Sequence, residues 1–301
     1  TFNVWAINAF GWSVASDATD GVTPLLARAV FGGGYISGGW NNVIEYVEIS
    51  TTSNGTDFGD LIESKGALAA YSSTTRGIFA GGQTASGDTV AIDYVTIQST
   101  GNASDFGDIS RTNTGYIYGA SNSTRGLSFG GNDRNNIDYV TIATTGNTSD
   151  FGDMSQNSYS GTAAASPTRA ICHVTNNGGA NDTLEYVTIA STGNTTDFGD
   201  AADPIKLSAA CSSDVRMVRG GGANSSGTKL QSMWYVTIAS TGNETSFGQL
   251  SNAVVGLFST SSNTRGLFAG GDHQTLGRLN NIDYVTIASA GNATDFGDLT
   301  A

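Results

Sequence analysis

Short apolar runs separated by polar, glycine-rich segments follow one another along most of the chain. One stretch reads GALAAYSS (66–73), RGIFAGG (76–82), IDYVTI (92–97) and DFGDI (105–109). Runs of this length, rich in Val, Ile, Tyr and Phe and bounded by Gly, Asn, Asp and Ser, are typical of β-strands joined by turns. The pattern therefore predicts four consecutive strands, which we name A, B, C and D in chain order.

The four runs recur in six units. In every unit a tyrosine of strand C is followed 12 residues later by a phenylalanine of strand D. The tyrosines are Tyr46, Tyr94, Tyr139, Tyr186, Tyr235 and Tyr284, and the phenylalanines are Phe58, Phe106, Phe151, Phe198, Phe247 and Phe296. The units repeat every 44 to 49 residues and cover about 27–61, 74–109, 123–154, 167–201, 214–250 and 263–299.

A repeat of this length, made of four short strands, indicates a propeller blade. The Gly-Gly pair after strand B and the aromatic residues in strands C and D resemble kelch repeats over residues 27–300. Two features depart from kelch: the outer aromatic is Phe rather than Trp, and unit 4 (RAICHVTNN) lacks the Gly-Gly pair. We predict an all-β fold, a six-bladed kelch-like β-propeller with four antiparallel strands per blade.

Residues 1–26 precede the first complete unit and read TFNVWAINAFGWSVASDATDGVTPLL. Unit 1 has no strand A of its own, and this segment is apolar enough to need burial. We expect it either to supply the innermost strand of blade 1 or to pack on a partner chain. The missing initiator Met hints at processing or at a fragment of a longer chain.

The connection between strands B and C differs from unit to unit, whereas the other spacings are nearly constant. From the second Gly to the Tyr it measures 12, 12, 8, 13 and 13 residues in units 1, 2, 3, 5 and 6. In a four-stranded meander the B–C and D–A connections emerge on the same face. Because binding residues often lie on loops of a rigid scaffold, we predict a recognition face whose candidate residues are Tyr35, Trp40, Asp133, Arg134, Lys229, His273 and Arg278.

An arginine opens strand B in every unit, and an aspartate precedes the Phe of strand D in five units. The arginines are Arg28, Arg76, Arg125, Arg169, Arg216 and Arg265, and the aspartates are Asp57, Asp105, Asp150, Asp197 and Asp295. A guanidinium suits a partly buried carboxylate, so we predict structural Arg–Asp ion pairs. Calcium bound by these carboxylates is the alternative, although the EF-hand pattern is absent.

The turn between strands C and D carries Asn-X-Ser/Thr in all six units, at Asn54, Asn102, Asn147, Asn194, Asn243 and Asn292. In a secreted eukaryotic protein these asparagines would be N-glycan acceptors. A turn function also fits, because Gly-Asn supplies positive φ and Ser or Thr caps neighbouring amides. We favour the turn, since the position is fixed in every repeat.

Composition narrows the functional classes. The net charge of −13 argues against a nucleic-acid partner, because there is no clustered Lys/Arg footprint. Cys172 and Cys211 lack zinc-site spacing, and we expect both to be buried free thiols. No apolar run reaches the length of a membrane span, so we expect a soluble chain. His173 and His273 have no nucleophile motif nearby, so we predict neither enzyme activity nor a cofactor.

The wording TRGLFAGG followed by NNIDYVTIASAGNATDFGDL resembles repeat segments of virion structural proteins from marine tailed phages, of the cyanophage type. The resemblance implies a tail-fibre or appendage protein of an extracellular virion. Its expected partners are other virion proteins and a host-surface glycan or protein, within a homo-oligomer or larger assembly. The alternatives are a secreted carbohydrate-binding propeller and a propeller glycoside hydrolase.

Overall fold

The computed structural model describes residues 7–8, 11–12, 27–36, 38–175 and 181–300, and every regular element in them is a β-strand. The A strands are β8 (Ala69–Ser72), β14 (Tyr118–Ser121), β18 (Thr162–Ala165), β22 (Ala209–Ser212) and β27 (Phe258–Ser261). The B strands are β3 (Arg28–Gly32), β9 (Arg76–Ala80), β15 (Arg125–Phe129), β19 (Arg169–His173), β23 (Arg216–Gly220) and β28 (Arg265–Ala269).

The remaining long strands are equally regular. The C strands are β6 (Val43–Glu48), β12 (Ala91–Thr96), β16 (Arg134–Thr141), β20 (Thr183–Thr188), β24 (Ser232–Thr237) and β31 (Asn281–Thr286). The D strands are β7 (Thr56–Asp60), β13 (Ser104–Asp108), β17 (Ser149–Ser158), β21 (Thr196–Asp200), β25 (Thr245–Gln249) and β32 (Thr294–Asp298). The predicted strand order within each unit is thus observed.

Each unit forms an antiparallel sheet in which consecutive strands are neighbours. Units 2 to 6 have four strands in the order A, B, C, D, and unit 1 forms the three-stranded sheet β3-β6-β7. The all-β prediction and the antiparallel four-stranded sheets are confirmed. We number the sheets by their units.

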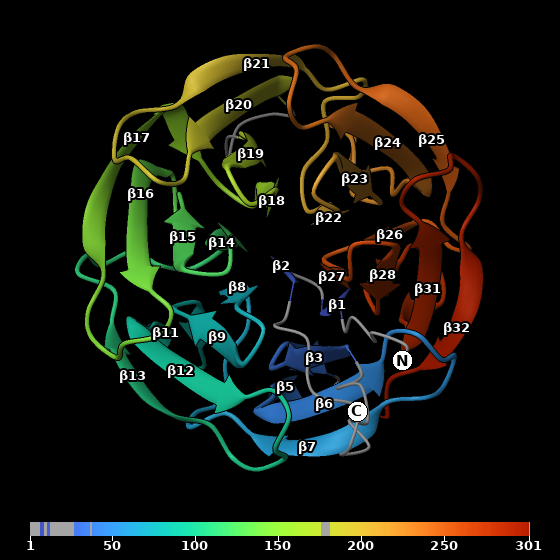
Figure 1. The fold of residues 1–301 in the computed structure, drawn as a ribbon. Coiled ribbons are helices and arrows are strands. Elements are labelled where there is room, and N and C mark those ends of the chain that lie inside the picture. The colour runs from blue at the N-terminus through green and yellow to red at the C-terminus, as the bar shows by residue number, and fades with distance from the viewer. Residues whose placement is uncertain (1–6, 9–10, 13–26, 37, 176–180, 301) are drawn as a thin grey trace, which may run out of the picture.

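The six sheets follow one another around a common centre, with the A strands innermost and the D strands outermost (Figure 1). The hydrophobic core lies between neighbouring sheets rather than within one. One cluster joins Tyr71 and Ile78 of sheet 2 to Ile142 of sheet 3, and another joins Ala29 of sheet 1 to Leu267 of sheet 6. Each sheet is therefore stabilised by its two neighbours.

A β-bulge between strands C and D explains the repeated Tyr and Phe. In sheet 2, Ile92 lies opposite Gly107 and Asp93 lies opposite Asp105, so Phe106 is the extra residue of strand D. The phenylalanine points inward and meets the tyrosine of its own sheet edge-on, at 5.9 to 6.1 Å between ring centroids in all six sheets.

The glycine after this phenylalanine is required by the next sheet. In sheet 5, Gly248 has a φ of +157°, and a Cβ there would lie 2.1 Å from the carbonyl oxygen of Gly291 in sheet 6. The equivalent glycines of the other five sheets have φ values between +141° and +148° and similarly close neighbours. The Phe-Gly step of DFGD is thus a close backbone contact between sheets.

Short strands form within the B–C loops, and in unit 6 one of them pairs with the D–A connection. The hairpins are β4 (Tyr35–Ile36) with β5 (Gly39–Trp40), and β10 (Gln83–Thr84) with β11 (Gly87–Asp88). In unit 6, β26 (Val254–Val255) from the D–A connection pairs with β29 (Asp272–His273), which pairs with β30 (Gly277–Arg278). The two kinds of connection therefore share one face, as predicted, and we call it the loop face.

Sheet 1 has no strand A among the described residues. From the N-terminal segment the structure describes β1 (Ile7–Asn8) and β2 (Gly11–Trp12), which pair with each other. The rest of residues 1–26, to which we assigned the innermost strand of blade 1 or a partner contact, lies outside the described residues.

Candidate recognition surface and the joints that hold it

The arginine at the start of strand B joins each sheet to the next one. In all six units its guanidinium lies 4.1 to 4.4 Å from the ring centroid of the strand C tyrosine. Its Nη1 donates to the carbonyl oxygen of an isoleucine in the following sheet, at 2.7 to 3.2 Å. The last of these bonds runs from Arg265 of sheet 6 to Ile49 of sheet 1.

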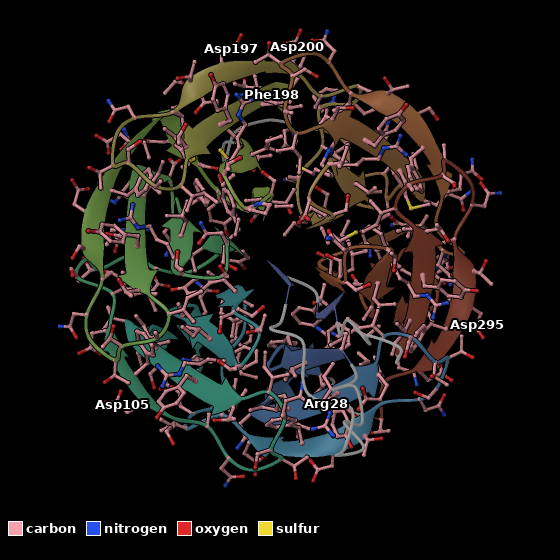
Figure 2. All side chains as sticks on the ribbon, in the orientation of Figure 1. Arg28, Asp105, Asp197, Phe198, Asp200 and Asp295 are labelled. Carbon is pink, nitrogen blue, oxygen red and sulfur yellow. The ribbon has the colours of Figure 1, made fainter. Side chains whose placement is uncertain are left out.

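The predicted ion pairs between these arginines and the DFGD aspartates are wrong. Among the described residues, the only carboxylate paired with a repeat arginine is Glu48, 2.9 Å from Nε of Arg28. Asp57, Asp105, Asp150, Asp197 and Asp295 are all exposed, and those labelled in Figure 2 lie at the outer circumference. The guanidinium instead finds an aromatic face and a backbone carbonyl, so these aspartates contribute surface charge.

The repeated asparagine forms a second joint. Its Oδ1 accepts a hydrogen bond, at 3.0 to 3.1 Å, from the backbone N–H at the end of strand D in the preceding sheet. The residue after the asparagine donates its own N–H to a carbonyl of the same strand end, at 2.7 to 2.9 Å. Both bonds recur at all six junctions, from Asn54 against Asp298 to Asn292 against Gln249. The asparagine is thus a structural residue that links two sheets.

A third joint was missed at the sequence level. The residue before each strand C tyrosine is buried, and in five units it is an acid: Glu45, Asp93, Asp138, Glu185 and Asp283. Four of these carboxylates bind the segment that follows strand D of the preceding sheet, and Glu185 binds Ser155 within strand D itself (β17). The fixed place of the acid, one residue before the tyrosine, was the available signal.

The partners of these acids differ between junctions. Asp93 pairs with Lys65 at 3.2 Å, and Asp138 with Arg111 at 2.5 Å. Asp283 accepts hydrogen bonds from the backbone N–H and hydroxyl of Ser251, at 2.9 and 2.8 Å. Burial raises the pKa of Asp93 and lowers the pKa of Lys65, while their mutual attraction opposes both shifts.

In unit 5, Trp234 takes the place of this acid, and a buried Arg–Glu ion pair lies beside it. Arg219, fully buried in strand β23, lies 4.8 Å from the Trp234 ring centroid and binds both carboxylate oxygens of Glu244, at 2.7 and 2.5 Å. Its Nη1 has no hydrogen-bond partner among the described residues. His173 of sheet 4 is also fully buried, with Nε2 2.7 Å from the carbonyl oxygen of Asn181. Burial, with a smaller contribution from Arg219, lowers the pKa of His173 well below its ordinary value.

Few Lys and Arg residues lie outside the joints and the buried pairs. The chain has 13 Lys and Arg residues, all within the described part. Six open the B strands, and Lys65, Arg111 and Arg219 belong to buried pairs. The other four lie in the B–C or D–A connections, or next to them: Arg134, Lys206, Lys229 and Arg278. Every Lys or Arg that neither opens a B strand nor belongs to a buried pair therefore lies on the loop face.

Three predicted recognition residues come together where sheets 1 and 6 meet. Tyr35 and Trp40 face each other across the β4–β5 hairpin, with ring centroids 5.0 Å apart and an interplanar angle of 88°. Arg278, from β30 of unit 6, lies 4.5 Å above the Tyr35 ring. We call Tyr35, Trp40 and Arg278 the aromatic–arginine cluster. Sequence alone did not place these loops together.

This cluster is accessible. Tyr35 is 49% exposed, and Ile36 beside it is 41% exposed. Leu276, on the turn between β29 and β30, is 66% exposed. Trp40 is half-buried, because its ring covers Gly66 of unit 2, where a Cβ would lie only 2.6 Å from it. A cavity of about 600 Å³ borders Tyr35 and Arg278, with Phe31, Phe258 and Leu279 among its lining residues.

The other predicted residues do not join this cluster. Lys229 pairs with Asp272 of the next unit at 2.6 Å. His273 accepts hydrogen bonds at Nδ1 from the N–H groups of Thr275 and Leu276, so it caps its own turn. Asp133 and Arg134 are exposed residues of unit 3. These four residues are spread over the loop face.

No group of three or more His, Cys, Asp or Glu side chains in the described residues could hold a metal ion. Cys172 and Cys211 are buried free thiols, as predicted. Within the described part of the chain, no helix could cross a membrane. No protein-family model matches the sequence, and no curated protein is significantly similar to it.

Proposed function

We propose that the chain is a six-bladed kelch-like β-propeller, with residues 27–301 forming the blades. Three sets of contacts support the proposal, because each joins a sheet to its neighbour and also joins sheet 6 to sheet 1. These are the Arg–Ile bonds, the Asn bonds and the buried acids, and at the last junction they involve Arg265, Asn54 and Glu45. A joint that recurs between the last and first sheets is what a closed propeller requires.

The propeller is a non-enzymatic structural and adhesive protein of a virion that recognises a host surface through its loop face. The observation that carries this proposal is the aromatic–arginine cluster at the junction of sheets 1 and 6. Tyr, Trp and Arg dominate binding energy at recognition surfaces. Here they lie in loops of unrelated sequence, beside exposed Ile36 and Leu276. The four cations on this face that the joints do not use add to the contrast with the otherwise acidic chain.

The repeat resemblance to phage virion proteins favours a virion over a secreted carbohydrate-binding protein. The carboxylates of DFGD support no catalytic pair, since they recur in five blades and the first aspartate of each is exposed. Other virion proteins are the second class of partner for the loop face. A glycan is one host-surface ligand, and a protein is the other.

The test is binding of purified protein to a glycan array and to virions from which it has been stripped. Tyr35→Ala and Arg278→Ala should each weaken binding about 30-fold or more, since truncation of a central anchor costs about 2 kcal/mol or more. Arg134→Ala is the matched control, because it removes another exposed cation of the same face outside the cluster. Unchanged thermal stability would show that the variants remain folded.

The outcomes distinguish the hypotheses. Glycan binding lost in the cluster variants supports host recognition, and loss of virion binding alone assigns the loops to assembly. Unchanged binding of both variants to both probes would refute a recognition role for the cluster.

A further inference from the structure

Strand β3 differs from the other B strands because one of its edges is free among the described strands. The other five B strands pair with a strand A on one side and a strand C on the other, whereas β3 pairs only with β6. Ala29 and Phe31 of β3 are nonetheless buried. A buried, unpaired strand edge is costly, because its N–H and C=O groups need partners.

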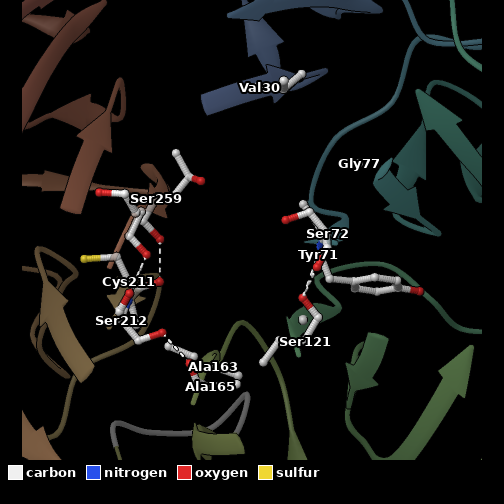
Figure 3. Close-up of a pocket in the computed structure, with 18 of the residues that line it drawn as sticks. Val30, Tyr71, Ser72, Gly77, Ser121, Ala163, Ala165, Cys211, Ser212 and Ser259 are labelled. Atoms are coloured by element: carbon white, nitrogen blue, oxygen red, sulfur yellow. Dashed lines mark hydrogen bonds between the residues drawn. The ribbon is translucent and has the colours of Figure 1, made fainter. Parts of the chain in front are cut away.

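The other sheets show which residues of β3 have backbone groups facing this edge. In sheet 2, Ile78 and Ala80 of β9 lie opposite Tyr71 and Ala69 of β8. The equivalent residues of β3 are Val30 and Gly32. Val30 lines two central cavities, of about 170 and 320 Å³, together with residues of the inner strands. In Figure 3, Val30 faces the same space as Ser259 and Ser72 of the two flanking inner strands.

The segment leading into strand A of unit 1 does not belong to the described residues. The second glycine of the Gly-Gly pair packs on this segment of its own unit elsewhere: Gly82 on Gly66 and Leu68, and Gly222 on Lys206 and Ser208. Within the described part of the chain, a Cβ on Gly34 of unit 1 would meet the Phe258 ring of sheet 6 and nothing else. The cavity of about 600 Å³ beside Gly34 lies where this segment would run.

We propose that the free edge of β3 is a strand-accepting site, and that its occupant is segment 12–17 of the same chain. The segment reads WSVASD and aligns with AACSSD at 209–214, which forms β22 and its turn and ends in the same Ser-Asp. This alignment sets Trp12, the end of β2, at the position of Ala209, Tyr118 and Phe258, where inner strands begin.

Two further observations support this occupant. Figure 1 shows the β1–β2 hairpin inside the outline formed by the inner strands. A strand from the same chain also has a high effective concentration at the site. The alignment leaves ten residues between Asp17 and Arg28, where unit 5 has one between Asp214 and Arg216. Lengthening a connection by this number of residues costs little free energy.

The proposal fixes a register that can be tested with engineered disulfides. Ser72 lies opposite Gly77 in sheet 2, and the equivalent pair in sheet 1 is Ala15 with Ala29. The double variant Ala15→Cys/Ala29→Cys should form an intrachain disulfide on mild oxidation, because opposed residues of paired strands have Cβ atoms within disulfide range. The offset pair Val14→Cys/Ala29→Cys should form much less.

The native cysteines do not interfere with this experiment. Cys172 and Cys211 are buried, and burial raises the pKa of the Cys211 thiol to about 12. Mass spectrometry of the peptides under non-reducing conditions gives the connectivity. An interchain disulfide would identify a second copy as the strand donor. Equal yields from the matched and offset pairs, or no disulfide from either, would overturn the proposal.

Discussion

The two ends of strand B behave differently. At its start, one arginine repeats the same two contacts in all six sheets. At its end, the last two residues vary among the units, from Phe31-Gly32 through Cys172-His173 to Arg219-Gly220, although units 2 and 6 share Phe-Ala. The start joins sheet to sheet at a fixed geometry, whereas the end faces a loop that differs in every unit. Contacts that repeat in every unit thus identify the joints between sheets. Residues that differ between units lie either on the loop face or at a place where one buried pair replaces another.

The largest loss of stability should come from breaking the buried Arg219–Glu244 pair of unit 5. Glu244→Ala leaves the guanidinium of Arg219 buried without its carboxylate, which should cost about 3–5 kcal/mol in the free energy of unfolding, measured by urea titration. The double variant Arg219→Phe/Glu244→Ala should recover most of this loss, because Phe79 and Phe268 hold the same position in units 2 and 6. Asp105→Ala, which removes an exposed carboxylate, is the control.

The next effect concerns the backbone contact between sheets 5 and 6. Gly248→Ala should lower the free energy of unfolding by about 3 kcal/mol, because the new Cβ requires a strained φ and collides with Gly291. Gly291→Ala is a close control on the other side of the same contact, since its Cβ would meet nothing within 4 Å. Similar stabilities for the two variants would contradict the assigned contact.

The arginine joint should have a smaller effect. Arg169→Ala removes a hydrogen bond to a backbone carbonyl and the stacking on Tyr186, which together should cost about 2 kcal/mol in chemical unfolding. Asp197→Asn should change stability by less than about 0.5 kcal/mol, since Asp197 is exposed. Equal losses would restore the ion-pair hypothesis. A loss for Arg265→Ala like that for Arg169→Ala would support closure of the ring.

The smallest change in stability should depend on pH and come from His173, which is buried in sheet 4. His173 is held neutral in the folded state, whereas the unfolded chain takes up its proton below about pH 6.5. Its contribution to the free energy of unfolding should therefore fall with decreasing pH, by at most about 1.4 kcal/mol per pH unit. The difference between wild type and His173→Gln isolates this group. A difference that does not change between pH 7 and pH 5 would rule out the effect.

The regular part of the fold could be predicted from sequence because it depends on spacing. Tyr284 and Phe296 recur at a fixed separation, and the strands around them lie where the pattern placed them. The partner of the arginine could not be deduced in the same way. Tyr284, Ile287 and Asp295 keep the same separations from one another as their equivalents in other units, so spacing cannot distinguish which of the three positions the arginine contacts.

Two other features depend on contacts that local patterns do not encode. Tyr35 and Arg278 are 243 residues apart, and they meet because sheet 6 packs against sheet 1. The exchange of an acid for Trp234 was visible in the sequence, as were Arg219 and Glu244. Their coupling follows only from the geometry, which brings strand B and the C–D turn of unit 5 to the same buried space.

The arginine joint and the asparagine joint share one property with a consequence for divergence of the repeats. The repeated arginine and asparagine both bind backbone groups of the neighbouring sheet, a C=O that every residue type supplies and an N–H that every residue type except proline supplies. A substitution in the neighbour other than to proline cannot remove the partner atom, so each of these two joints needs only one side chain to be retained. Units can then exchange, duplicate or accumulate changes without matched mutations on the facing sheet. An interface of this kind lets the loops of each unit vary independently of those beside it.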